Sequence, residues 1–147
     1  MEMTNEQYNA YVKSIAPASP LAMDMVKAFV SGGAICCVGQ LILNLYLSYG
    51  LARLDAAAAT SITMVLIGAA LTGLGVYDKM AKFSGAGTLV PITGFANSVV
   101  APALEFKTEG FVTGTAAKMF VIAGPVIVFG ISASVVYGLV LVLFGLA

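Results

Sequence analysis

The stretch FSGAGTLVPITGFANSVVAPAL, residues 83–104, decides the fold, because it is long and uncharged but is interrupted by helix-breaking residues. A proline inside a helix removes a backbone hydrogen bond, and lipid offers no partner for the groups that are freed. We therefore predict a discontinuous, re-entrant segment, with a second half-helix from about residue 93 to residue 106. The residues that we place at the break, where they would gate a path, are Gly85, Gly87, Pro91 and Gly94.

Three further stretches contain no charged residue: 28–52, 56–77 and 119–147. Each is at least 22 residues long, and a helix needs about 20 apolar residues to cross the hydrocarbon of a bilayer. Only 10% of the 147 residues are charged, whereas a soluble domain carries about 25%. We predict an all-α integral membrane helical bundle, with residues 1–27 as a polar leader and 28–147 as a single transmembrane domain.

The distribution of basic residues distinguishes two topologies, because cytoplasmic loops are enriched in Lys and Arg. If residues 83–104 dip into the membrane and return, six lysines lie on one side and only Arg53 lies on the other. If they cross fully, Lys13, Lys27, Lys79 and Lys82 face Arg53, Lys107 and Lys118. The first arrangement has the stronger bias and favours three spanning helices plus the broken segment. Four spans are the alternative.

Polar side chains inside the uncharged stretches are candidates for a path through the membrane. Gln40 and Asn44 are four residues apart on one helix face, and amides are costly in hydrocarbon unless they are hydrogen-bonded. They serve either as interhelical contacts or as a pore lining, and both roles can hold together. The broken segment adds Thr93, Asn97 and Ser98 to this set.

Small residues at helical spacing predict close helix packing, which is the usual source of association in lipid. The second span carries Gly68 and Thr72, and the last span carries Gly130, Ser134 and Gly138. We expect these positions to be packing surfaces in a larger assembly.

Composition also argues against several classes of function. The chain has no histidine, which is the commonest general base and metal ligand. Its seven basic and seven acidic side chains cancel, so nothing indicates a nucleic-acid partner. The turn at residues 85–87 lacks the lysine of a phosphate-binding loop. We expect no catalytic residue, metal or cofactor, which leaves a channel or a structural subunit of one.

The run YDKMAKFSGAGTLVPITGFANSVVAPALEFKTEG, residues 77–110, resembles the membrane subunits of stage V sporulation protein A, the SpoVAC/SpoVAEb family. Residues 32–46 and 123–138 support the resemblance, which covers nearly the whole chain. The leader with SIAPASP and the GFANS sequence are more similar to the AC-type subunits than to the shorter AE-type ones.

The resemblance implies a multi-pass protein of the inner spore membrane, which is the forespore cytoplasmic membrane. It implies a channel subunit that moves dipicolinic acid, or its calcium chelate, into the spore and out again during germination, with a response to membrane tension. The implied partners are paralogous spore membrane subunits, as in a hetero-oligomer, and a soluble dipicolinate-binding subunit. In such a channel, Lys79, Lys82 and Lys118 would raise the local anion concentration. A non-conducting scaffold subunit is the alternative.

Overall fold

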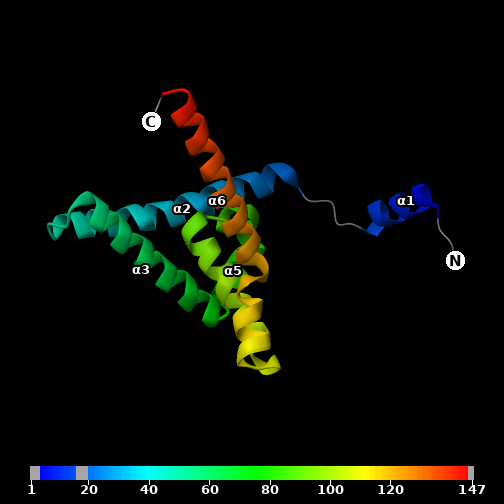
Figure 1. Cartoon of the computed structure of the whole chain (residues 1–147). Helices are drawn as coiled ribbons and strands as arrows, with labels where there is room; N and C mark the ends of the chain where they lie inside the picture. The colour runs from blue at the N-terminus through cyan, green and yellow to red at the C-terminus, as the bar shows by residue number, and fades with distance from the viewer. Residues whose placement is uncertain (1–3, 16–19, 146–147) are drawn as a thin grey trace.

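The computed structural model describes residues 4–15 and 20–145, and every element in those residues is helical (Figure 1). The longer helices are α1 (Asn5–Ile15), α2 (Leu21–Ser48), α3 (Arg53–Gly73), α4 (Val76–Ser84), α5 (Pro91–Glu105) and α6 (Phe120–Leu143). Short helical turns connect them: η1 (Gly85–Thr88), η2 (Lys107–Glu109) and η3 (Phe111–Ala116).

Three helices are long and apolar enough to cross a membrane. They are α2, α3 and the helix Phe111–Leu143. The last of these begins with the π-helical turn η3, which leads into α6. Helix α5 has 15 residues, which corresponds to about 22 Å and falls short of the hydrocarbon thickness. The predicted all-α bundle with three spanning helices is confirmed, and the chain is a multi-pass membrane protein.

The segment 83–104 is broken, as its glycines and prolines predict. Helix α4 ends at Ser84, and Gly85 follows with a φ of 53°, which glycine adopts without strain. After the turn η1, Pro91 begins α5. A proline at the first helical position is favourable because its missing N–H would have no partner there. The second half-helix therefore begins two residues earlier than residue 93.

The helix boundaries differ from those of the uncharged stretches, most clearly at the end of α3 and the start of α2. Helix α3 ends at Gly73, because Gly75 takes a left-handed φ of 68° and turns the chain into α4. Helix α2 begins at Leu21 and so includes the last residues of the predicted leader. The domain boundary at residue 27 stays a prediction, and residues 1–3 and 16–19 of that leader lie outside the described residues.

The broken segment lies at the centre of the packing. Helix α5 packs along α3, the turn η1 packs on α2, and α6 contacts the other helices mainly through α5. The buried apolar side chains of the described residues are few and mostly small: Ala56, Met64, Tyr77, Ala96 and Ala123. Small side chains let helix backbones approach closely, so this bundle is held by backbone proximity more than by large core residues.

Candidate functional site

A hydrogen bond joins the second span to the broken segment. The Thr72 hydroxyl on α3 donates to Oδ1 of Asn97 on α5 at 2.9 Å. Both side chains line a cavity of about 320 Å³, together with Asp78 and Ala81 of α4 and the α5 residues Ala101 and Leu104. Two residues predicted for different roles, one in packing and one in the path, therefore meet at one polar cavity.

One turn earlier on each helix, Gly68 lies against Thr93. A β carbon at Gly68 would lie 3.2 Å from the Thr93 Cα and 3.3 Å from the Ala96 β carbon, so only glycine fits without displacement. Thr93 is 4% exposed, and its hydroxyl has no hydrogen-bond partner within the described part of the chain. An unpaired buried hydroxyl costs about 1–3 kcal/mol, and a water or ligand atom would satisfy it.

The turn η1 docks closely on the first span. A β carbon at Gly87 would overlap the Ser31 hydroxyl and would lie 2.5 Å from the carbonyl oxygen of Ala28. In return, a β carbon at Gly32 would lie 3.2 Å from the Gly87 carbonyl oxygen. Backbone therefore meets backbone at this contact, which holds the tip of the break on α2.

A buried hydrogen bond between Tyr77 and Thr88 stabilises the break. The sequence did not predict this role for either residue. The Tyr77 hydroxyl donates to the Thr88 carbonyl oxygen at 2.7 Å, and both residues are buried. This bond satisfies a carbonyl that the interrupted helix leaves free. The available signal was Gly75, which separates Tyr77 from the spanning helix and places it on α4.

Gln40 and Asn44 bind each other on α2, with the Gln40 amide donating to Asn44 Oδ1 at 2.9 Å. Neither amide is hydrogen-bonded to Asn97, whose side-chain oxygen accepts from Thr72. Gln40 nevertheless borders the start of α5, because it lines a groove of about 280 Å³ with Thr60, Val90 and Ile92. The groove thus joins the polar stripe of α2 to the first turn of α5.

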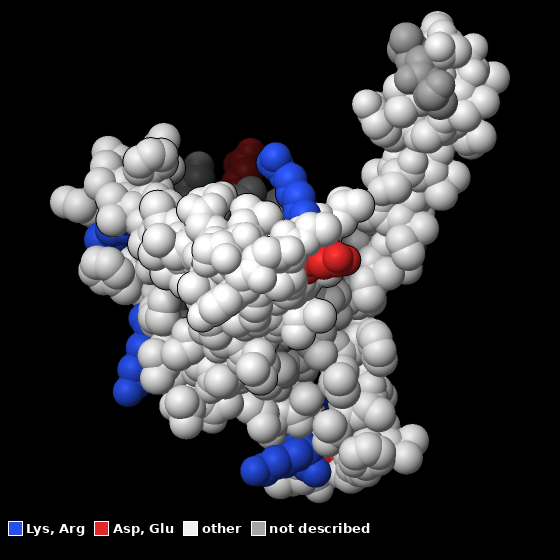
Figure 2. Space-filling view, turned by 90° about the vertical axis from the view of Figure 1, so that its left-hand side faces the viewer, with Lys and Arg blue, Asp and Glu red and all other residues white. Residues whose placement is uncertain are grey.

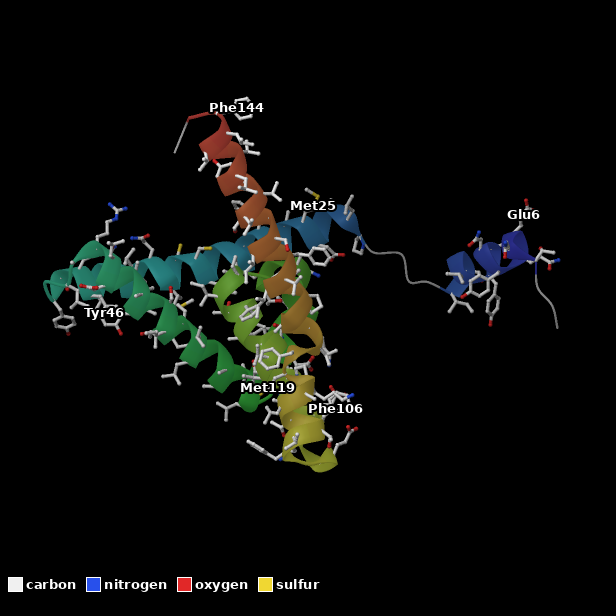
Figure 3. The ribbon with its side chains drawn as sticks, viewed as in Figure 1. Glu6, Met25, Tyr46, Phe106, Met119 and Phe144 are labelled. Atoms are coloured by element: carbon white, nitrogen blue, oxygen red, sulfur yellow. The ribbon has the colours of Figure 1, made fainter. Side chains whose placement is uncertain are left out.

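The predicted site residues with charges are dispersed. Lys82 forms an ion pair with Asp78 at 2.8 Å, and this carboxylate raises the pKa of Lys82 through a hydrogen bond and its charge. The Lys118 ammonium lies 4.3 Å from the centre of the Phe106 ring, which Figure 3 labels at the end of α5. Lys79 lines a separate groove beside α2. Ser98 donates only within its own helix, to the Phe95 carbonyl oxygen.

Of the small residues predicted for packing on α6, Gly130 and Ser134 are exposed and Gly138 is half-buried. Gly130 and Gly138 have no heavy atom within 4 Å of the position that a β carbon would take, and the Ser134 hydroxyl donates to the Gly130 carbonyl oxygen. In Figure 2, α6 forms the arm that projects at the upper right, and this arm shows no charged side chain. This face is free for lipid or for another subunit.

Comparison with known proteins gives consistent matches. The profile of a family described as SpoVAC/SpoVAEB sporulation membrane protein matches residues 24–140. The chain is similar to stage V sporulation protein AC of Bacillus subtilis (strain 168), with 46% identity over 141 residues that cover 94% of each chain. No solved structure matches it.

Proposed function

Because the chain belongs to the SpoVAC/SpoVAEB sporulation membrane protein family, we propose that it is a channel subunit for dipicolinic acid or its calcium chelate. It acts in the inner membrane of the spore, for uptake during sporulation and release in germination. Its partners are paralogous membrane subunits and a soluble dipicolinate-binding subunit. The observation that carries this proposal is the break between α4 and α5, which brings polar groups to membrane-embedded helices.

The first turn of α5 suits an anionic substrate. Its N-cap residue Val90 provides no side-chain hydrogen bond, so the first N–H groups keep their partial positive charge. Free dipicolinate carries two carboxylates, and discontinuous helices in transporters direct such N-termini at carboxylates. The groove that Val90 and Ile92 share with Gln40 is the part of the path next to this turn.

The cavity at Thr72 and Asn97 is the more polar part of the proposed path. It lies where α5 meets α3 and α4, and its lining includes the carboxylate of Asp78. A carboxylate and an amide oxygen are ligands that calcium accepts, so the calcium of the chelate can be held here when Asp78 leaves its ion pair with Lys82. The glycine-containing turn η1, which precedes α5, is the hinge that we propose for a gate.

Dipicolinate accumulation in spores tests the path. We expect Asn97→Leu and Gln40→Leu each to lower the dipicolinate content of spores at unchanged protein level. Asn9→Leu, which replaces an exposed amide on α1, is the matched control and should leave the content unchanged. Normal dipicolinate content in both test variants would remove these residues from the path.

The exposed face of α6 favours a second candidate, a non-conducting scaffold that holds a paralogous pore. Reconstitution of the purified chain alone in planar bilayers separates the two functions. Conductance from the isolated chain supports the channel, and silence that ends only when a paralogue is added supports the scaffold. Opening by stretch, without preference for dipicolinate, would instead identify a tension-gated valve of low selectivity.

A further inference from the structure

A groove of about 680 Å³ lies between the first turns of α2 and the helix α4. Its walls are apolar on both sides, and no acidic residue belongs to its lining among the described residues. The lining residues are Val26, Lys27, Val30, Ser31 and Ala34 of α2 and Val76, Lys79, Met80, Phe83 and Ser84 of α4. The volume is within the range of about 300–1,000 Å³ that is usual for small-molecule sites.

The α2 wall of this groove is a straight apolar stripe. Val26, Val30 and Ala34 are successive residues at four-residue spacing, so they lie above one another along about 12 Å of helix. Val26 and Val30 are 60% and 64% exposed, although large apolar side chains border them across the groove. An extended hydrocarbon chain would cover this stripe.

Two lysines from different helices flank the same groove, which they line mainly with their apolar stems. Lys27 is the last charged residue of α2 before its uncharged stretch, so it lies at the boundary between headgroups and hydrocarbon. Its ammonium is 5.5 Å from the centre of the Phe83 ring on α4. Lys79 lines the groove from α4. Basic side chains beside an apolar groove at this depth are the chemistry that recognises an anionic lipid headgroup.

We infer that this groove binds one anionic phospholipid from the leaflet on the lysine-rich side. An acyl chain lies along Val26, Val30 and Ala34, and the phosphate lies between Lys27 and Lys79. The dipicolinate path proposed above is separate, because none of its polar residues except Lys79 lines this groove.

Lipid in the groove would act on the broken segment. Ser31 lines the groove and also contacts Gly87 of η1, and Ser84 lines it at the end of α4. An occupant therefore borders the contact that holds η1 on α2.

Native mass spectrometry of the full chain with phosphatidylglycerol or phosphatidylcholine tests the headgroup. We expect tighter binding of phosphatidylglycerol, and a loss of about fivefold for each lysine removed in Lys27→Gln and Lys79→Gln. Lys107→Gln removes an exposed lysine on η2, outside the groove, and is the matched control. Equal binding of the two lipids, or an equal loss in the control, would overturn the inference.

Filling the groove tests the acyl chain. Val30→Trp should abolish binding of phosphatidylglycerol, whereas Ile62→Trp, at an exposed apolar position of α3, should leave it unchanged. The unmodified chain provides a measurement that needs no variant: a phosphatidylglycerol with a photoreactive acyl chain should label the two walls of the groove. Labelling that spreads evenly over α3 and α6 would show general solvation by lipid. Labelling of the groove that is lost only when another subunit is added would show that a protein occupies the groove. Either result refutes the lipid site.

Discussion

Gly87 lies directly on Ala28, so that a β carbon at Gly87 would be 2.5 Å from the Ala28 carbonyl oxygen. The obstacle is backbone, which cannot move aside as a flexible side chain would. We expect Gly87→Ala to lift η1 from α2 and to destabilise the protein by about 1–3 kcal/mol, the usual cost of overpacking. Thermal unfolding in detergent, followed by circular dichroism, measures this as a lower midpoint.

Gly33→Ala is the control for that experiment. Gly33 lies on α2 near the same contact but has nothing within 4 Å of its added β carbon. The midpoint should stay or rise, because alanine is the better helix former. If the Gly87→Ala protein is as stable as the parent, η1 does not dock on α2 in the detergent-solubilised protein.

The bond between Thr72 and Asn97 predicts energetic coupling between the second span and the broken segment. In a double-mutant cycle with Thr72→Val and Asn97→Leu, we expect a coupling energy of about 0.6 kcal/mol and at most about 1.7 kcal/mol, as for other interhelical bonds in membranes. The free energy of unfolding in detergent provides the measurement. Thr63→Val paired with Asn97→Leu is the control, since Thr63 bonds Tyr46 instead. If the two substitutions of the first pair change the free energy of unfolding additively, the Thr72 and Asn97 side chains do not interact.

The interruption of residues 83–104 was predictable because glycine and proline act on their own backbone. Pro91 suits the first position of a helix, and Gly85 permits a positive φ, through the local backbone alone. The three spans were predictable for a similar reason, since crossing the hydrocarbon depends on local length and polarity.

The contacts around the break were not predictable in the same way. The bond from Tyr77 to the Thr88 carbonyl depends on how the chain turns at Gly75 and again at η1. The fit of Gly87 against α2 depends on two segments more than fifty residues apart in sequence. The spacing of Gln40 and Asn44 predicts that they share one helix face, but it does not predict the hydrogen-bond partner of either amide. In the structure the two side chains bond to each other. Roles of these residues in conduction stay predictions.

The re-entrant topology predicts which side of the membrane the break faces. Single cysteines at Asn97, Glu105 and Lys107, in a chain whose exposed Cys36 and Cys37 are replaced by alanine, would be probed with an impermeant thiol reagent. Because α5 is too short to cross, we expect Glu105 and Lys107 replaced by cysteine to react from the same side as Lys79→Cys. Arg53→Cys, at the start of α3, should react from the opposite side. Reaction of the Glu105 position from the Arg53 side would instead establish four spans.

The small residues of α6 predict a surface for assembly. Gly130 and Gly138 contact no other helix, and only Ala123 is buried among the residues of α6. In lipid, a small-residue face allows a second helix to approach closely, whereas a large side chain on it keeps that helix away. We expect Gly130→Ile with Gly138→Ile to leave the thermal midpoint of the isolated chain nearly unchanged but to prevent its copurification with paralogous subunits from spores. Val128→Phe with Val136→Phe, at exposed positions of the same helix, adds as many carbon atoms as the test variant, so it is the matched control for added bulk and should copurify normally. Loss of the complex in both double variants would show a response to bulk anywhere on α6, and intact complexes in both would place the assembly surface on another helix.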